Sequence, residues 1–291
     1  MNRMAGNTLL HPAQGQAPAH HKVTGLPGQL SDQEFRLFRE MMFSHAGISM
    51  SDAKKQLVAG RLAKRLRHLE LESYRVYFDR LRHDKAEMQT AVDLLTTNET
   101  YFFREPKHFN FLKEVVLPEM RQQANIRIWS AACSSGEEPY TLAMVLSEVL
   151  GNRRWDIVAS DLSTRVLEHA RQGRYTMEDA NGIPPGLLGK YCLKGVGSQE
   201  GVFMIKQDLR ARIDFRQINL NATMPDIGIF DVIFLRNVMI YFDLDTKRQV
   251  VQRLLPLLRP GGYFMLSHSE NLNGVNNVLK SVRPSIYRKP G

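Results

Sequence analysis

An alternation of strand-like and helix-like segments, which begins at residue 126, constrains the fold of this chain more than any other feature. Residues 126–132 and 155–160 are short apolar runs typical of buried strands, and residues 137–150 between them carry apolar side chains at helical spacing. A further buried-strand pattern follows at residues 230–235. Strands that alternate with helices form a parallel sheet with helices on both faces, so the sequence predicts a doubly wound α/β domain over residues 97–291.

The last part of the chain predicts how this sheet closes. A helical pattern at residues 245–258 ends at Pro260 and Gly261, both of which favour a turn. Residues 263–267 and 286–288 follow as two short apolar segments. We expect them to form an antiparallel pair at one edge of the sheet.

A different pattern precedes the α/β domain and predicts a small all-helical domain over residues 31–96. Ser31 and Glu34 have the spacing of a capping box, which opens the first helix. A second helix begins near Ser51, and two shorter helical patterns follow it. Residues 1–30 contain several prolines and glycines without apolar periodicity, so we expect a flexible leader there.

One stretch, residues 188–218, interrupts the alternation of strands and helices. Its apolar segments at residues 191–194, 202–206 and 213–215 predict short antiparallel strands. The loop between the first two of these segments contains Gly195, Gly197 and Gly201. We interpret the stretch as an inserted β subdomain, which is either a docking surface or an exposed hairpin without a partner.

Composition limits the classes of protein to which the chain can belong. Its 291 residues are 43% hydrophobic, enough for a core in each of two domains, and only two are cysteines. No apolar run reaches the ~18 residues that span a bilayer, and no signal peptide is recognisable. We therefore expect a cytoplasmic protein without disulfides, and without a metal site because neither cysteine has a partner at ligand spacing. The net charge of +9 favours an anionic partner, either nucleic acid, lipid headgroups or an acidic protein.

Small residues and one acid predict a cofactor site in the α/β domain. Residues 130–136, between the first strand and the next helix, all have small side chains, which either let a ligand approach the backbone or only allow tight packing. Asp161, at the end of the second strand, is placed to bind ribose hydroxyls, although it could also cap a helix. Together they favour an adenosine-containing cofactor. The lack of G-x-G-x-x-G, with Ala131 and Ala132 in its place, counts against NAD and leaves S-adenosylmethionine.

Two further segments combine polar and aromatic side chains near this expected site. Residues 95–105 carry more apolar surface than a linker usually does, so we expect them to pack over a cleft. Within them, Arg104 could bind a carboxylate, or it could simply pair with Glu99 or Glu105. Residues 236–242 follow a buried strand at the carboxyl edge of the sheet, where ligands of open α/β folds bind.

Three of these motifs together resemble one family of enzymes. They are residues 96–105 (TTNETYFFRE), 130–140 (SAACSSGEEPY) and 236–242 (RNVMIYF). In this order they closely resemble the chemotaxis receptor methyltransferases of the CheR family, and the resemblance covers residues 31–291. Residues 268–271 (HSEN) match the closing segment of that family; the chain has no nucleophile elbow, which argues against a hydrolase triad.

The resemblance implies a fold, a cofactor and a reaction. The fold is a small helical domain followed by a Rossmann-like, class I methyltransferase domain that binds S-adenosyl-L-methionine. The implied reaction transfers a methyl group to glutamate carboxylates of chemoreceptors (methyl-accepting chemotaxis proteins), giving γ-methyl esters and S-adenosyl-L-homocysteine, and serves adaptation in chemosensory signalling. Two features depart from the family pattern, namely Ala132, where many relatives have glycine, and the unusually long leader.

The resemblance also implies a role for individual residues. Arg104 and Tyr241 match the positions that orient the substrate carboxylate near the reacting methyl group. Asp161 matches the ligand of the ribose, and Asn219 with Leu220 matches the pair that contacts adenine. The positions that match the cofactor site are Asn98, Thr100, Arg104, Ala132, Glu138, Asp161, Asn219, Leu220, Leu235 and Arg236.

The second predicted helix is strongly basic, with no carboxylate between Asp52 and Glu70. A run of charge is usually only a solvated face, but this one would suit the acidic methylation helices of a receptor. The residues predicted to contact that partner are Lys54, Arg61, Lys64 and Arg65. Nucleic acid is the competing partner, and we argue against it because aromatic side chains do not alternate with the basic ones.

The glycine-rich loop of the β insertion, with Gly195, Gly197 and Gly201, resembles the longer loops of family members that bind a peptide at the receptor C-terminus. Strand addition to this edge is the expected mode. We further expect a monomer that is recruited to membrane-bound receptor arrays without inserting into the membrane. The alternatives are a nucleic-acid methyltransferase and a non-catalytic module that senses S-adenosylmethionine; intact Arg104, Asp161 and Tyr241 argue against the module.

Overall fold

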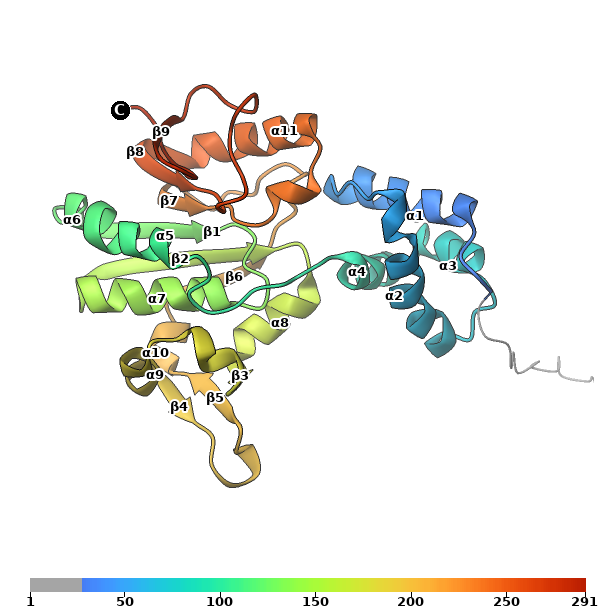
Figure 1. Cartoon of the computed structure of the whole chain (residues 1–291), viewed down its shortest axis with the longest axis horizontal. Coiled ribbons are helices and arrows are strands. Elements are labelled where there is room, and N and C mark those ends of the chain that lie inside the picture. Colours follow the sequence, from blue (N-terminus) through green and yellow to red (C-terminus); the bar gives the residue numbers. More distant parts are fainter. Residues whose placement is uncertain (1–27) are drawn as a thin grey trace, which may run out of the picture.

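The computed structural model describes residues 28–291, which form a helical part beside a larger α/β body (Figure 1). A small β sheet projects from the body on the side away from the last strands (Figure 1). The predicted leader, residues 1–30, lies almost wholly outside the described residues. Within the described range, no helix combines the length and the apolar composition needed to cross a membrane.

The helical part forms as the sequence predicts. Its helices are α1 (Asp32–Ala46), α2 (Lys55–His68), α3 (Tyr74–Leu81) and α4 (Lys85–Leu95), with a 3-10 turn, η1 (Asp52–Lys54), before α2. The capping box is present, since the Ser31 hydroxyl accepts from the Glu34 N–H and the Glu34 carboxylate accepts from the Ser31 N–H. Val58, Leu62 and Leu66 are fully buried at helical spacing, so α2 packs through this stripe.

The body contains a seven-stranded sheet in the order β6-β2-β1-β7-β8-β10-β9. The strands are β1 (Asn125–Ser130), β2 (Arg154–Asp161), β6 (Ile213–Gln217), β7 (Phe230–Phe234), β8 (Leu258–Met265), β9 (Lys280–Arg283) and β10 (Ile286–Arg288). The first five in sheet order run parallel, and β10 pairs antiparallel with β8 and β9. The predicted parallel sheet and its antiparallel closing pair are therefore confirmed.

Helices cover both faces of this sheet. The body helices are α5 (Pro106–Phe111), a π turn η2 (Leu112–Val116), α6 (Leu117–Glu119), α7 (Glu137–Leu150), α8 (Thr164–Gln172) and α11 (Leu244–Leu254), with short turns η5 (Met239–Tyr241) and η6 (Leu255–Leu257). Along β7, Val232 and Phe234 pack with α5 and α7, whereas Ile233 packs with α11 on the other face. This alternation follows from the two-residue period of a strand and gives the sheet two separate cores.

One predicted strand belongs to a different sheet. The projecting sheet consists of β3 (Arg174–Thr176), β5 (Val202–Ile205) and β4 (Cys192–Lys194), joined by η3 (Asp179–Gly182), α9 (Pro185–Tyr191) and η4 (Gly197–Gln199). The assignment of residues 213–215 to this insertion is wrong, because β6 pairs parallel with β2 at the edge of the main sheet, after the short α10 (Gln207–Arg210). A short apolar run does not reveal its partner strand, and this one finds β2 through long-range packing.

The helical part and the body are joined by polar contacts. The Asp93 carboxylate on α4 accepts hydrogen bonds from the Thr164 N–H (3.0 Å) and hydroxyl (2.7 Å), which caps α8 from outside the body. The Ser49 N–H donates to the Tyr241 carbonyl (2.8 Å), and the Asn219 side chain donates to the His45 carbonyl (2.6 Å). These contacts place α1 and α2 over the carboxyl ends of the parallel strands.

Candidate functional site

A cleft lies between the helical part and the carboxyl ends of β1, β2 and β7, with about 1230 Å³ of space including its open mouth. The predicted site residues that line the cleft are Asn98, Thr100, Arg104, Ala132, Glu138, Asp161, Asn219, Leu220, Arg236 and Tyr241. Segments far apart in the sequence therefore meet in one place, as predicted for the carboxyl edge of this sheet.

Asp161 occupies the end of β2 beside the loop of small residues. Its Oδ2 accepts from the Ser134 N–H and its Oδ1 from the Ser163 N–H, both at 2.9 Å. Burial raises the pKa of this carboxyl, although the two backbone donors oppose the shift. The helix-cap alternative is thus partly true, because Asp161 braces the start of α8 while it also faces the cleft.

The backbone of the loop of small residues packs closely against α8 and β3 at Gly136. Gly136 has φ +101°, and a Cβ there would lie 2.8 Å from the Ala170 Cβ and the Tyr175 hydroxyl. Only glycine fits this position without a shift of the neighbours. Ser134 also has a positive φ, 49°, and its hydroxyl donates to the Asn98 carbonyl at 2.9 Å. The loop is therefore tied to the segment that carries Arg104.

Arg236 sits at the centre of a buried ion-pair network. Its Nη1 lies 2.7 Å from Glu138 Oε2, and its Nη2 lies 3.0 Å from Glu105 Oε2. Only 2% of the Arg236 side chain is exposed, so the two carboxylates compensate a charge that water cannot reach. Nη2 also donates to the Arg104 carbonyl, which fixes the backbone of that residue. Sequence reasoning considered Glu105 only as a partner for Arg104 and missed this role.

Two contacts hold the Arg104 side chain in place, and neither involves a carboxylate. Its Nη1 donates to the Glu99 carbonyl at 2.7 Å, and its guanidinium lies 5.6 Å from the centre of the Tyr101 ring. Neither contact is an ion pair, so the predicted alternative of a pair with the Glu99 or Glu105 carboxylate is wrong. A half-buried guanidinium with no ion pair recorded among the described residues is suited to an incoming anion.

Tyr241, in the turn η5, lies half-buried on the same cleft. Burial and then the Glu99 charge raise the pKa of its hydroxyl. The phenol is therefore protonated at neutral pH and can donate a hydrogen bond.

Glu270 holds the turn that carries Tyr241 and was not predicted as a site residue. Its carboxylate accepts from the N–H groups of Asn237 (3.0 Å), Ile240 (3.2 Å) and Ser267 (3.0 Å). Asn237 has a positive φ of 58°, which the surrounding bonds must maintain. The HSEN segment was the available signal, and the structure gives it a positioning role.

Three of the residues predicted for the cofactor site, Asn219, Leu220 and Leu235, lie in different environments. Asn219 and Leu220 line the cleft, and the side-chain Oδ1 of Asn219 accepts a hydrogen bond from the Asn221 N–H at 2.9 Å. Leu235 is the exception, because its side chain is fully buried in the core beside α11 and does not line the cleft. The sequence placed Leu235 in the segment beneath the cofactor, and its contact with the cofactor stays a prediction.

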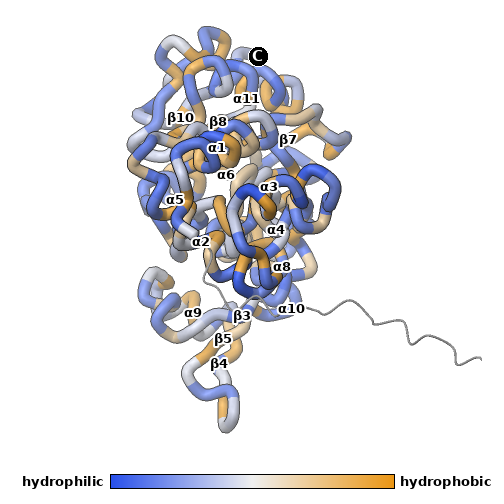
Figure 2. The backbone as a smooth tube through the Cα atoms, turned by 90° about the vertical axis from the view of Figure 1, so that its right-hand side faces the viewer, coloured by the Kyte–Doolittle hydropathy of each residue, from blue (hydrophilic) through white to orange (hydrophobic). Residues whose placement is uncertain are grey.

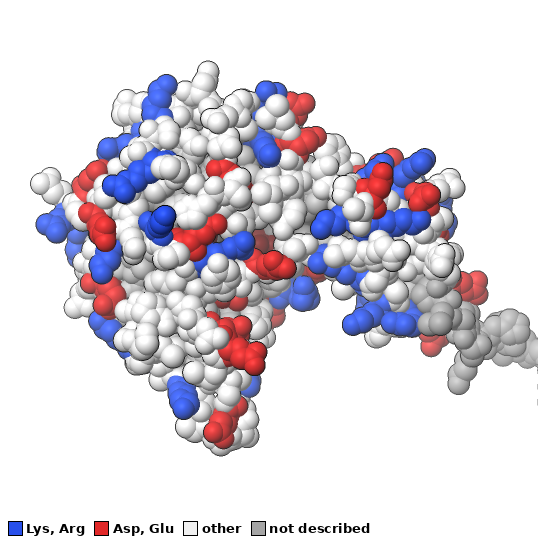
Figure 3. Space-filling model, in the orientation of Figure 1, with Lys and Arg blue, Asp and Glu red and all other residues white. Residues whose placement is uncertain are grey.

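The basic helix presents fewer free charges than its sequence indicates. Arg65 pairs with Glu87, which is only 4% exposed and also accepts from the Tyr77 hydroxyl. Arg61 donates to the carbonyls of residues 95 and 96 at 3.0 and 2.9 Å. Both arginines thus stabilise the chain itself, which leaves Lys54 and Lys64 as the exposed members of the predicted set. Figure 3 shows basic and acidic side chains intermixed over the helical part.

The β insertion presents an unpaired edge. In the described structure, β4 has β5 on one side and no strand on the other, and the hairpin projects away from the body (Figure 2). Leu193 on β4 is 55% exposed and Val196 in the loop is 79% exposed. Gly195 is required where it stands, because a Cβ would lie 1.9 Å from the Gln199 carbonyl oxygen.

One cluster of potential metal ligands was not foreseen. Glu105, His108 and His268 lie together behind Arg236, outside the cleft, and each offers a ligand atom within 4.8 Å of the others. Burial and then the Arg236 charge lower the pKa of His108 to about 4, so its imidazole is neutral. Sequence spacing could not reveal this group, because His268 follows β8, far along the chain from the other two.

Comparisons with known proteins agree with this architecture. Residues 33–96 match the family model described as "CheR methyltransferase, all-alpha domain", and residues 98–287 match "CheR methyltransferase, SAM binding domain". The chain is 42% identical over 260 residues to "Chemotaxis protein methyltransferase 2" of Pseudomonas aeruginosa, which covers 88% of this chain and 92% of that one. It is also 42% identical over 265 residues to "Chemotaxis protein methyltransferase" of Escherichia coli (89% and 91%), and 36% identical over 271 residues to that of Borreliella burgdorferi (89% and 94%). S-adenosyl-L-methionine is therefore the co-substrate.

Proposed function

Because the chain belongs to the CheR family of S-adenosylmethionine-dependent chemotaxis methyltransferases, we propose that its substrates are glutamate side chains of chemoreceptors. The products would be glutamyl γ-methyl esters and S-adenosyl-L-homocysteine. The observation that carries this proposal is the shared cleft, in which Arg104 and Tyr241 lie beside the residues suited to the cofactor.

The residues of the cleft fit the cofactor chemically. A ribose needs a hydrogen-bond acceptor for its hydroxyls, and Asp161 supplies a half-buried carboxylate at the end of β2. An adenine ring needs apolar contacts, which Leu162, Ile218 and Leu220 offer on the lining of the cleft. The loop of small residues lets the rest of the molecule approach the backbone. We propose these residues, with Glu138 and Asn98 toward the methionine end, as the cofactor site.

The proposed reaction requires little proton chemistry from the protein. S-adenosylmethionine, when bound, supplies an electrophilic methyl group on a positively charged sulfur. A glutamate carboxylate is already ionised at neutral pH, so no general base is needed to activate it. Attack brings a negative and a positive charge together, and a cleft that removes water from both favours the charge-dispersed transition state.

The chain's own residues would position the carboxylate. Arg104 can bind both oxygens of a carboxylate through its fork of N–H donors, and the protonated Tyr241 hydroxyl can donate to one of them. Arg236, which Glu105 and Glu138 hold in place, fixes the Arg104 backbone by donating a hydrogen bond to its carbonyl. Such positioning can supply several kcal/mol of the barrier, about 7–11 in the best intramolecular models.

Receptor binding is proposed for two surfaces. Lys54 lines the cleft and Lys64 is exposed on α2, so both can approach acidic residues of a methylation helix. The open edge of β4, with the exposed Leu193 beside it, suits strand addition by a peptide from the receptor C-terminus. Recruitment to receptor arrays would follow from these contacts.

Peptide mapping would test the proposed substrate. Purified receptor cytoplasmic fragments, incubated with the protein and S-adenosylmethionine, should gain the mass of one methylene group on glutamates of their methylation helices. Fragments in which these glutamates are replaced by alanine serve as the matched control. Methylation that persists on other residue types, or that appears instead on added RNA or DNA, would contradict the proposal.

A further inference from the structure

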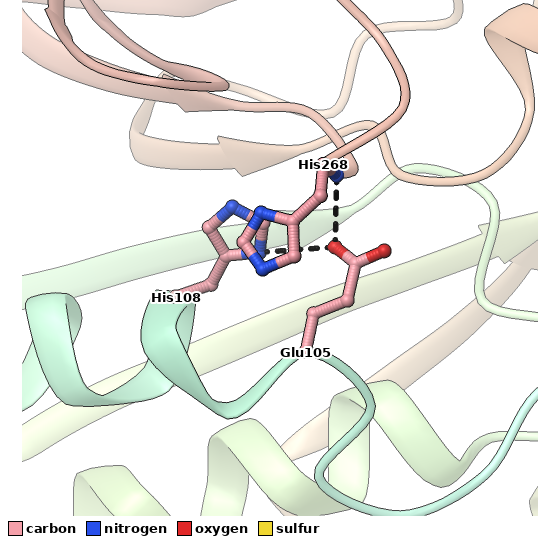
Figure 4. Close-up of side chains that lie close together, drawn as sticks. All are labelled: Glu105, His108 and His268. Atoms are coloured by element: carbon pink, nitrogen blue, oxygen red, sulfur yellow. Dashed lines mark hydrogen bonds and ion pairs between the residues drawn. The ribbon is translucent and has the colours of Figure 1, made fainter.

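We propose that Glu105, His108 and His268 form a binding site for a divalent transition-metal ion such as Zn²⁺, next to the cofactor cleft but outside it. The three side chains come from the start of α5 and from the loop after β8 and face one another (Figure 4). This inference does not depend on the proposed substrate, because it concerns residues that do not line the cleft.

The spacing of the trio is close to that of a shared metal ion. Zn²⁺ binds histidine nitrogen and carboxylate oxygen at about 2.0–2.2 Å, so two tetrahedral ligands lie roughly 3.4 Å apart. His108 Nδ1 lies 3.4 Å from Glu105 Oε2, which already matches. All three ligand atoms lie within 4.8 Å of one another, and the exposed His268 ring, whose centre lies 4.6 Å from that of the His108 ring, would shift slightly to share one ion.

His108 supplies an independent reason to expect a ligand. The residue is only 1% exposed, and neither ring nitrogen has a hydrogen-bond partner among the described residues. A buried polar side chain without a partner is uncommon and calls for an explanation. The 3.4 Å between His108 Nδ1 and Glu105 Oε2 is too long for a good hydrogen bond. A metal ion bound between these two atoms would give Nδ1 a partner.

Arg236 is the charged group that a bound cation must tolerate. Its guanidinium is already paired with both Glu105 and Glu138, so these three side chains together carry one net negative charge. With a bound divalent ion, the three side chains and the ion would together carry one net positive charge. This charge would lie next to the solvent-exposed His268 imidazole and not deep in the core. Every contact recorded for the Glu105 carboxylate within the described residues uses Oε2, which leaves Oε1 for rearrangement toward the ion.

The ligand types select the class of metal. Two imidazoles and one carboxylate suit Zn²⁺, Co²⁺ or Ni²⁺, whereas Mg²⁺ and Ca²⁺ prefer sites made only of oxygen. Three protein ligands leave a fourth position for water on the side of His268, through which an ion can also enter.

Cobalt titration of the untagged full-length protein, after removal of metals with a chelator, tests the site. Co²⁺ should produce the visible absorption typical of a cobalt ion with four or five ligands, and this absorption should saturate at one ion per chain. Zn²⁺ should displace the Co²⁺, and Mg²⁺ should not. His268→Ala should weaken the affinity at least tenfold. This variant should keep its fold, because the His268 side chain is exposed and its backbone N–H can still donate to Glu105.

The matched control is His83→Ala, which removes an exposed histidine of the helical part and should leave the titration unchanged. Any binding by the histidines of residues 1–27 is common to all variants and cancels in the comparison. Thermal unfolding gives a second readout, since Zn²⁺ should raise the melting temperature of the unsubstituted protein more than that of His268→Ala. Equal affinity and equal shifts in both proteins, or no cobalt spectrum at millimolar metal, would overturn the proposal.

Discussion

At the scale of single residues, the site depends on which charges are already compensated and which remain available. Arg236 is paired on both sides, whereas Arg104 is held only by a carbonyl and an aromatic ring. The first arginine therefore organises the site, and the second can receive an anion. The division could not be read from the sequence, where both arginines stand in equally polar motifs.

Arg104→Ala should reduce turnover far more than cofactor affinity. The loss of a charged donor aimed at the reacting carboxylate is expected to lower kcat by roughly 10²-fold. Binding of S-adenosylhomocysteine, measured by calorimetry, should change by less than about tenfold, and Arg104→Lys should recover only part of the turnover because it lacks the forked geometry. Unchanged turnover at saturating receptor would contradict a role for Arg104 in positioning the carboxylate.

The pH dependence of cofactor binding should report on Asp161. In the proposed cofactor site the ionised carboxylate would accept hydrogen bonds from the ribose hydroxyls. Burial raises the pKa of Asp161, so affinity should fall as the pH is lowered, beginning at a higher pH than for an exposed aspartate. Asp161→Asn should bind about 10–100-fold more weakly at pH 7. Calorimetric titrations across the acid range should show a slope in the unsubstituted protein that the variant lacks; parallel slopes would assign the effect to another group.

At the scale of elements, one helix of the helical part completes another helix in the body. Asp93 on α4 caps the N-terminus of α8, whose N-cap residue, Ser163, donates its N–H to Asp161. A cap of this kind stabilises by about 1 kcal/mol and fixes where the helix starts. The helical part therefore contributes to the geometry of the cofactor site as well as covering it.

Asp93→Ala should lower the free energy of unfolding by about 1–2 kcal/mol, because three donors at the start of α8 lose their acceptor. Urea unfolding would measure the change. Asp79→Ala is the matched control, since it removes an exposed carboxylate whose pair with Arg75 is worth at most about 0.5 kcal/mol. Equal losses in both variants would contradict a capping role for Asp93.

Shortening the loop at residues 195–201 should separate tethering from catalysis. If a receptor tail adds a strand to β4, a variant with this loop replaced by a two-residue turn should bind a tail peptide at least tenfold more weakly. Its affinity for S-adenosylhomocysteine should stay the same, because none of residues 195–201 lines the cleft. Equal losses of both affinities would indicate misfolding, and a retained peptide affinity would exclude this loop from the tether site.

At the scale of the whole molecule, the sequence predicts local features better than partners. The capping box at Ser31, the parallel strands and the motif residues around the cleft follow from short patterns. The partner strand of β6, the buried Leu235 and the internal bonds of Arg61 and Arg65 depend on packing between distant segments. The Glu105–His108–His268 trio belongs to the second kind, because no spacing along the chain brings His268 to α5.

The helical part and the body together line the cleft. The body alone would leave the carboxyl edge of its sheet open, and α1 with α2 closes one side of it through the contacts at Ser49 and Asn219. The result is one cleft that the predicted cofactor residues share with Arg104 and Tyr241. Both reactants of the proposed reaction could then occupy one space from which much of the water is excluded.

Transfer of labelled methyl from S-adenosylmethionine to receptor cytoplasmic fragments, followed by alkaline treatment, tests the central claim most directly. A carboxyl ester is hydrolysed by base, whereas methyl groups on amines or nucleobases are not. The account predicts label on the receptor protein that alkali releases as methanol, and that Arg104→Ala incorporates far more slowly. Label that survives alkali, or no label despite measured binding of S-adenosylmethionine, would contradict it.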